Sequence, residues 1–236
     1  MYTQHKISLH IELEVAPAAQ FQIRHQIEGL IQQLLPDSPC TVHLQLPHQS
    51  GLELNFLGQS SVWWNGQPLS LRQRFNELLA ILALHPDGLS SEQVSLCLYG
   101  DDKNSGCSRI ELARLRQIVP IDSRPYRLVG VQADFLELRA HLYAGRVDQA
   151  LKLYGGPLLP HSGAPAIVET RLDLEEAIRR AVLISRNPDH LWTLANTIGD
   201  DLELWEIALD YLPDLDPRRA LAETQRGRIT GEWKAA

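Results

Sequence analysis

The amino-terminal part of this 236-residue chain alternates between apolar and polar positions. Residues 7–15 (ISLHIELEV) and 40–46 (CTVHLQL) place an apolar side chain at every second position, which is typical of strands with one buried face. Between them, apolar residues recur at helical spacing over residues 21–35. The pattern predicts a small β-α-β unit over residues 1–50. Because its core would be thin, we expect it either to pair with a second copy, which we prefer, or to lean on the next domain.

Short strands joined by tight turns are predicted next. The polar, turn-rich segment PHQSG at residues 47–51 marks a domain boundary. The runs LELNFLG, SSVWW and QPLSL follow, and Asn65-Gly66 separates the last two. Asn-Gly is the preferred sequence of a two-residue type I′ hairpin. We therefore expect a small antiparallel sheet that precedes the first helix of the domain.

The apolar period changes to 3.6 residues at Arg72. A first helix is predicted from there to the HPDG turn that begins at His85. A second helix should follow at once, with Ser90 or Ser91 as its amino-terminal cap and Gly100 just past its end. These two helices and the sheet before them form the start of a compact domain.

A third helix, which Pro120 should end, combines apolar period with positive charge. Between Lys103 and Arg127 there are six basic and two acidic residues, although the whole chain carries a formal net charge of −7. On a helical wheel the packing stripe consists of Ser108, Leu112, Leu115 and Val119, and the opposite side of Ile110, Ala113, Arg114 and Gln117, flanked by Arg109 and Arg116. Taken alone, this would be an ordinary surface helix. Its neighbours favour a face that contacts a negatively charged partner.

A short strand-like return follows the third helix in the segment PIDSRPYRLV. It contains Arg124, Tyr126 and Arg127 and has room for only a small hairpin. A sheet, three helices and a hairpin in this order make a winged helix-turn-helix. We place this domain at residues 51–130.

The same segments resemble a known family of regulators. LNFLG, WWNGQPLSL, NELLAILALHPDGLSSEQVSLCLYGDD, IELARLRQIV and RPYRL are similar to the OmpR-type winged helix of antibiotic-regulatory (SARP-like) transcription regulators. The following ADFLELRAHLYAGRVDQALKLYGGPLLP and VETRLDLEEAIRRAVLI resemble the bacterial transcriptional activator domain that succeeds the winged helix in that family. The resemblance covers roughly residues 52–185. It departs from the family pattern at Ala113 and Gln117.

The resemblance implies a transcription regulator that binds double-stranded DNA in a sequence-specific manner, with the third helix in the major groove. The implied DNA-facing residues are Arg109, Ile110, Ala113, Arg114, Arg116, Gln117, Arg124 and Arg127. Among them Arg114 is the candidate for a bidentate contact to a guanine. Arg116, Arg124 and Arg127 would meet phosphates. One recognition helix reads only a few base pairs, so we expect a homodimer.

The rest of the chain is helical and acidic. Amphipathic helices are predicted over 134–143, 147–154 and 165–185, and further helices from Asn187-Pro188 through Trp192, over 202–212 and over 217–229. Short links between them resemble tetratricopeptide-type (TPR-like) packing, so we expect an all-α domain at residues 131–236. From Leu128 onward there are 12 basic and 17 acidic residues. This charge favours a protein partner, such as RNA polymerase or another regulatory protein, over DNA.

The sequence offers no constellation typical of an enzyme. The motifs GxSxG, HExxH and GxxxxGK[ST] are absent, and three cysteines without metal spacing predict inert thiols. Adjacent carboxylates occur at Asp101-Asp102, Glu175-Glu176 and Asp200-Asp201. Neighbours on a helix point apart, so we expect solvated faces or caps. We therefore predict a protein without catalytic site, metal or cofactor. The alternative to a DNA-binding regulator is a protein-interaction scaffold that uses a winged helix and TPR-like helices without binding DNA.

Composition places the chain among folded proteins inside the cell. An apolar fraction of 44% supports buried cores, and no apolar run approaches the roughly 18 residues that a membrane span needs. The amino terminus alternates and does not offer the continuous apolar core of a secretory signal. We expect an α+β protein in the cytoplasm with no membrane partner.

Overall fold

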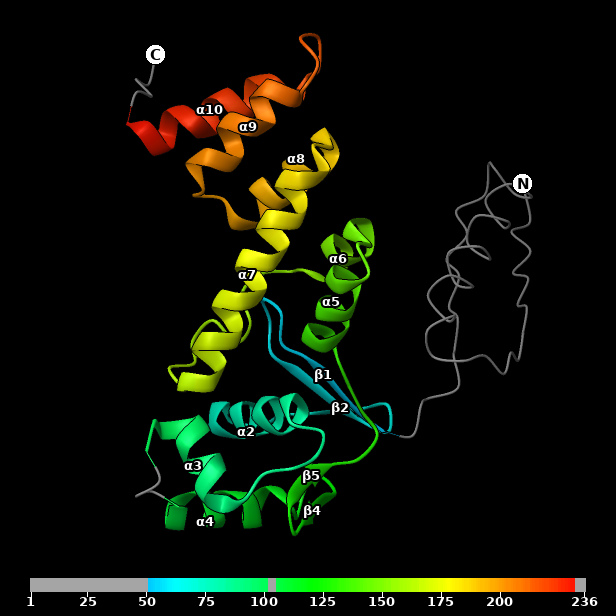
Figure 1. The fold of residues 1–236 in the computed structure, drawn as a ribbon, viewed down its shortest axis with the longest axis vertical. Coiled ribbons are helices and arrows are strands. Elements are labelled where there is room, and N and C mark those ends of the chain that lie inside the picture. Colours follow the sequence, from blue (N-terminus) through cyan, green and yellow to red (C-terminus); the bar gives the residue numbers. More distant parts are fainter. Residues whose placement is uncertain (1–50, 102–104, 232–236) are drawn as a thin grey trace, which may run out of the picture. The chain divides into compact units, whose positions relative to one another are not determined.

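The computed structural model of this chain describes residues 51–101 and 105–231. The β-α-β unit expected over residues 1–50, and with it the expected dimerisation segment, lies outside the described residues. The residues from Gly51 onward belong to one compact unit (Figure 1).

A four-stranded sheet opens this unit. Its strands lie in the order β3-β2-β1-β6, namely Gln67–Leu69, Ser61–Trp64, Leu52–Asn55 and Val131–Ala133. The first three are antiparallel neighbours, as predicted, whereas β6 runs parallel to β1 with Leu52 opposite Val131. The sequence pattern did not predict β6, which follows the three helices in the chain. The boundary expected between residues 130 and 131 therefore falls just before a strand of the same sheet.

The hairpin between β2 and β3 has the predicted turn. Asn65 and Gly66 both have positive φ, at 50° and 75°, and Trp64 lies opposite Gln67. Positive φ at both central residues is the requirement of a type I′ turn. This turn fixes the register of β3 on β2, as the Asn-Gly dipeptide predicted.

Three helices follow the sheet: α2 (Gln73–Leu84), α3 (Ser91–Tyr99) and α4 (Ser105–Leu115). The start of α3 is a capping box, in which the Ser90 hydroxyl accepts from the Gln93 amide and the Gln93 side chain accepts from the Ser90 amide. Gly100, at φ 80°, ends the helix in the left-handed conformation. The predicted caps of α3 are confirmed.

The prediction that α4 continues to Pro120 is wrong, because the helix ends at Leu115. The next amides bond three residues back, from Gln117 to the Arg114 carbonyl and from Ile118 to the Leu115 carbonyl. Such bonds tighten the last turn. A proline disfavours helical conformation at the residue before it, so the chain leaves the α-helix ahead of Pro120.

A two-stranded hairpin forms the wing after α4. It consists of β4 (Ile121–Ser123) and β5 (Tyr126–Leu128). Leu89, in the connection between α2 and α3, pairs with Tyr126 through two backbone hydrogen bonds of 2.9 Å. Tyr126 lies opposite Ser123, next to the turn at Arg124 and Pro125, so the hairpin is attached near its tip to the connection between α2 and α3.

The remaining described chain is helical. Its helices are α5 (Asp134–Tyr143), α6 (Val147–Leu153), α7 (Pro165–Ser185), α8 (Pro188–Ile198), α9 (Leu202–Tyr211) and α10 (Arg218–Thr230). Consecutive helices pack together, α5 on α6, α8 on α9 and α9 on α10. The long α7 contacts α2 and α3 as well as α5, α6 and α8. A winged helix followed by a helical region confirms the predicted α+β class, although α8 continues past the expected Trp192.

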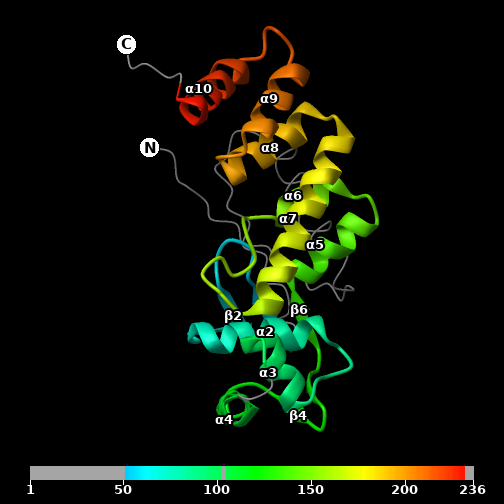
Figure 2. The same ribbon diagram turned by 60° about the vertical axis from the view of Figure 1, so that its left-hand side comes forward.

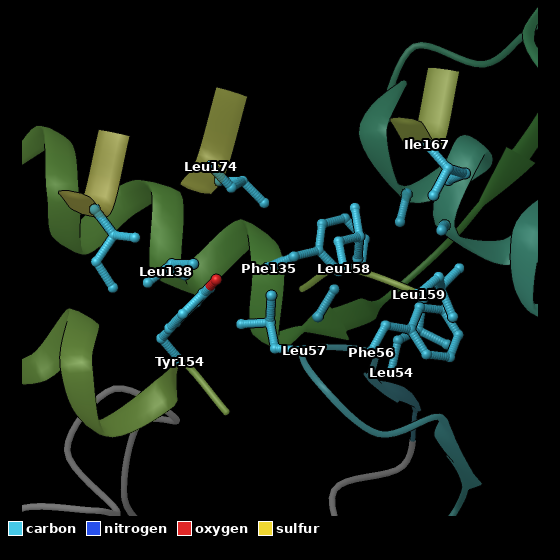
Figure 3. Packing of buried hydrophobic residues seen from close by; sticks show 14 of the residues in the cluster. Leu54, Phe56, Leu57, Phe135, Leu138, Tyr154, Leu158, Leu159, Ile167 and Leu174 are labelled. Atoms are coloured by element: carbon cyan, nitrogen blue, oxygen red, sulfur yellow. The ribbon is translucent and has the colours of Figure 1, made fainter. Parts of the chain in front are cut away.

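The winged helix and the helical region share one apolar core. Phe56, just after β1, stacks on Phe135 of α5 with ring centroids 6.3 Å apart and planes at 5°. The Phe56 carbonyl accepts from the Leu159 amide at 3.0 Å, and the Leu57 amide donates to the Asp134 carboxylate at 2.9 Å. Figure 3 shows Phe56, Leu57 and Phe135 close to Leu158 and Leu159, which belong to the connection between α6 and α7. The joint is therefore buried packing rather than a linker.

A buried carboxylate strengthens the same joint. Glu77 of α2 is only 3% exposed, and it accepts a 2.6 Å hydrogen bond from the Ser162 hydroxyl. Its other oxygen pairs with Arg74 at 2.8 Å. Burial of a carboxylate is costly unless it is hydrogen-bonded and paired. These contacts fasten α2 to the connection that leads into α7.

Gly58→Ala tests how closely the two regions approach. A Cβ at Gly58 would lie 2.4 Å from the Gly155 carbonyl oxygen, and φ is +81°. We expect the free energy of unfolding of the full chain, measured by chemical denaturation, to fall by more than about 2 kcal/mol. The control is Gly145→Ala, with φ +67° but nothing within 4 Å, which should cost only about 1 kcal/mol. Equal losses would show that the approach of the two backbones is not tight.

Candidate nucleic-acid interface

Helix α4 divides into the two faces predicted from its sequence. Ser108, Leu112 and Leu115 are fully buried, and Val119 is 1% exposed. On the opposite side Ile110 is 54% exposed, and Arg109, Ala113, Arg114 and Gln117 are exposed as well. The stripe is buried because α3 and α2 pack against it. The other face of α4 is thus accessible at Arg109, Ile110, Ala113 and Arg114.

The β4–β5 hairpin lies at the same end of the described unit as α4 in both views (Figures 1 and 2). Arg116, in the turn after α4, donates its Nε to the Ile121 carbonyl at 3.0 Å. This bond joins the end of α4 to the start of β4. The structure therefore brings the exposed residues of α4 and of the hairpin to one end of the winged helix.

Arg109 is held by the first turn of α3. Its Nε donates to the Ser91 hydroxyl at 3.0 Å and its Nη2 pairs with the Glu92 carboxylate at 2.7 Å. The pKa of Glu92 is lowered to about 2, chiefly by a backbone amide at the start of α3 and further by Ser91 and Arg109. Arg109 thus has a defined orientation, but an acid offsets its charge. The sequence pattern gave no signal for this partner.

Arg114 is held only loosely. Its Nη1 lies 3.6 Å from the Glu111 carboxylate, whose other oxygen pairs with Arg72. The Arg114 side chain is 61% exposed, whereas that of Glu111 is 17% exposed. Glu111 therefore pairs mainly with Arg72. The guanidinium of Arg114 remains available on the outer face of α4.

The two hairpin arginines differ in their contacts. Arg127 pairs with Asp122 across the hairpin at 2.8 Å. Arg124 is exposed at the turn, and within residues 51–101 and 105–231 it forms no ion pair or side-chain hydrogen bond. Arg124 is therefore the wing residue with an uncompensated charge.

Positive charge is concentrated on this end of the domain and not spread over it. From residue 105 to residue 128 there are five arginines, two acidic residues and no lysine. Residues 51–130 as a whole contain eight basic and eight acidic residues. The rest of the winged helix therefore has three basic and six acidic residues, so a phosphate backbone would find a positive field at this end and a net negative charge elsewhere on the domain.

The expectation that the paired carboxylates are solvated faces or caps holds for three of the four residues in the helical region. Glu176 and Asp200 are exposed, and Asp201 caps α9 by accepting from the Leu204 amide at 3.1 Å. Glu175 is half-buried, and burial raises its pKa. All four border one cavity of 560 Å³, which the end of α8 also lines.

Two other expectations concern thiols and membranes. Among the described residues Cys97 and Cys107 are free thiols, Cys97 half-buried on α3 and Cys107 exposed on α4. Among the residues with described positions, no three His, Cys, Asp or Glu side chains are grouped so that they could hold a metal ion. In that same part of the chain, no helix combines the length and apolarity needed to cross a membrane.

Comparisons with known proteins give two similarities. No protein-family model matches the chain. An uncharacterized 47.3 kDa protein in the thcA 5′ region of Rhodococcus erythropolis is 32% identical over 201 residues, which is 83% of this chain and 45% of that relative. The chain thus spans about half the length of this relative. The solved structure of Mycobacterium tuberculosis EmbR in complex with a low affinity phosphopeptide matches with a TM-score of 0.37 and 17% identity, over 78% of this chain and 66% of that one.

The contact between Arg109 and Glu92 predicts an unusual titration. Glu92 has a depressed pKa in the folded state, so it contributes stability above its ordinary value of 4.5 and loses it as pH falls through about 2. We expect the Glu92 carboxyl carbon to titrate near pH 2 by NMR. Arg109→Ala should raise this midpoint partway, since the backbone bond remains, and Arg180→Ala should not move it. A midpoint at 4.5 in the unaltered chain would exclude the contact in solution.

Proposed function

We propose that this chain is a SARP-like transcription regulator that binds double-stranded DNA in a sequence-specific manner, with α4 in the major groove. One observation carries the proposal: the accessible face of α4 bears Arg109 and Arg114 beside a hairpin that bears Arg124. An α-helix fits the major groove, and arginine is the residue that most often reads guanine there. The flanking hairpin is suited to the phosphate backbone.

The contacts of each arginine assign its role in this proposal. Arg114 reads a base, because its guanidinium is exposed and its contact with Glu111 is long at 3.6 Å. Ile110 supplies an apolar contact to a thymine methyl group, and Ala113 and Gln117 line the same face. Arg124 meets a phosphate, as Arg127 does once it leaves Asp122. Arg116 acts mainly by holding the hairpin against α4.

Arg114→Ala separates base reading from phosphate binding. After the preferred site is selected from a randomised library, the substitution should weaken that site by about 1–3 kcal/mol and flatten preference at one base pair. Arg124→Ala should weaken all sequences alike and lower the salt slope by about one. Arg180→Ala is the matched control, since it removes an exposed helical arginine that also pairs with a glutamate. Uniform weakening by Arg114→Ala would remove its role in base reading.

Glu111→Gln tests the opposite sign. It removes the negative charge that lies between Arg72 and Arg114, so DNA of any sequence should bind about threefold more tightly in fluorescence anisotropy at fixed salt. The matched control is Glu176→Gln, which removes an acid paired with Arg180 in the helical region and should have no effect. Unchanged affinity of the Glu111 variant would place the DNA away from Arg114.

We also propose that two copies act together. A single α4 covers few base pairs, and useful affinity requires a second recognition helix. The segment proposed to pair them is residues 1–50. Deletion of residues 1–47 keeps the compact unit that begins at Gly51, and should give a monomer with weaker DNA binding. If mass by light scattering and affinity for the selected site both stay unchanged, this segment does not mediate dimerisation.

The helical region is proposed to contact a regulatory protein such as RNA polymerase. Its acidic surplus disfavours DNA, and its packing on α2 and α3 through α7 leads to movement together with the winged helix. In this role the helical region binds a partner and carries out no catalytic step. Regulation would depend on the position along DNA at which the winged helix holds the helical region.

One observation favours the second candidate, a scaffold that does not bind DNA. Arg109 and Arg127 already have acidic partners at 2.7 and 2.8 Å. DNA would have to compete with Glu92 and Asp122 for them. Salt dependence separates the candidates, because the logarithm of a DNA-binding constant falls steeply with the logarithm of salt concentration, whereas a protein interface is far less sensitive.

A further inference from the structure

The cavity in the helical region has walls of two kinds. It is bordered by the connection between α6 and α7, by the middle of α7, and by the end of α8 with the residues after it. Apolar side chains at Pro157, Leu172 and Ile198 form part of its lining. Its volume of 560 Å³ falls in the range of small-molecule sites. Its residues are separate from those of α4 and the wing.

Negative charge dominates the polar part of this cavity. Four carboxylates and a single guanidinium, that of Arg179, line it. Arg179 is committed to Asp201, at 2.9 Å, and to Glu203. Glu176 is committed to Arg180. In the described part of the chain Glu175 and Asp200 form no ion pair; Asp200 is exposed, and Arg171 acts on Glu175 only through its charge.

Among the carboxylates of the cavity, Glu175 would be stabilised most by a bound cation. It is half-buried on α7, and desolvation raises its pKa although the positive charge of Arg171 opposes the change. The guanidinium of Arg171 is itself bound to the carbonyl oxygens of Leu158, Leu159 and Ser162. A buried carboxylate without a paired cation is costly. A positive group in the cavity would remove this cost.

Tyr154 is an independent sign of a ligand. The residue is 4% exposed, and it lies beside Leu138 at the end of α6 in Figure 3. Across residues 51–101 and 105–231 its hydroxyl makes no hydrogen bond and is not among the fully enclosed polar atoms, so it can be reached from the cavity that Tyr154 lines. Burial, and then the charge of Glu175, raises its pKa to about 12. Its oxygen is therefore neutral near pH 7 and can accept a hydrogen bond.

We propose that this cavity binds an aliphatic chain that ends in an ammonium or guanidinium group. Glu175 supplies the opposite charge and the Tyr154 oxygen accepts one of the several N–H donors that such a head group carries. Pro157, Leu172 and Ile198 contact the methylene stem. A neutral phenol and apolar walls suit an organic cation. This chemistry has two sources, a free diamine or guanidine and a lysine or arginine side chain of a partner protein.

Titration calorimetry of the full chain with 1,5-diaminopentane and with 4-guanidinobutylamine tests the proposal. Glu175→Gln should weaken binding about tenfold or more, because it removes the charge, and Tyr154→Phe about threefold, because it removes one hydrogen bond and keeps the ring. Asp173→Asn is the matched control, since it removes an exposed acid from the same helix, and should change nothing. The neutral analogue 1,5-pentanediol should not bind.

The proposal is overturned if neither cation binds the unaltered chain. It is also overturned if the Glu175 and Tyr154 variants bind the cations as tightly as the unaltered chain does, or if 1,5-pentanediol binds as tightly as 1,5-diaminopentane. Equal weakening by Asp173→Asn would also overturn it, because it would indicate a general effect of charge. Circular dichroism identifies any variant that does not fold. The comparison of diamine with diol binding to the unaltered chain tests the need for a positive charge without any variant. Tighter binding of a lysine-containing peptide than of the diamine identifies a partner protein as the source, and the reverse identifies a metabolite.

Discussion

Two stretches of backbone that are far apart in the chain pair antiparallel at Leu57 and Leu158, and the rest of the described structure depends on that pairing. The residues after β1 pass the connection between α6 and α7 so closely that Gly58 has no room for a side chain. Backbone hydrogen bonds run from Leu159 to Phe56 and from Gly58 to Pro157. The core side chains of the winged helix and of the helical region then pack as one cluster. The sheet, α2, α5 and α7 all bury their apolar faces in it.

This pairing determines which surfaces of the winged helix remain exposed to a partner. The side of the winged helix formed by α2 and α3 is covered by α7, while the outer face of α4 stays exposed. Charge follows the same division. Arginines gather on α4 and the wing of a chain that is acidic as a whole. The acids that pair with Arg109 and Arg127 orient these side chains and also limit their positive field.

Much of the fold and the orientation of α4 could be predicted because their signals are local. A type I′ turn needs two adjacent residues that tolerate positive φ, and Asn65-Gly66 supplies them. The capping box at Ser90 requires only four residues. The buried and exposed faces of α4 follow from apolar period alone, since period 3.6 determines which side chains share a face. The sequence by itself therefore determined the β2–β3 hairpin, the order of the helices and the two faces of α4, but neither β6 nor the end of α4.

Only the tertiary structure decided the partners. The strand β6 exists because its backbone pairs with β1, far earlier in the chain, and three residues are too few to carry a strand pattern of their own. Glu77 is buried because Ser162 reaches it. The pair of Arg109 with Glu92, and the cavity shared by Glu175 and Asp200, likewise join residues of different elements. Period and caps describe each helix singly, whereas these contacts depend on how the helices pack, which local patterns do not contain.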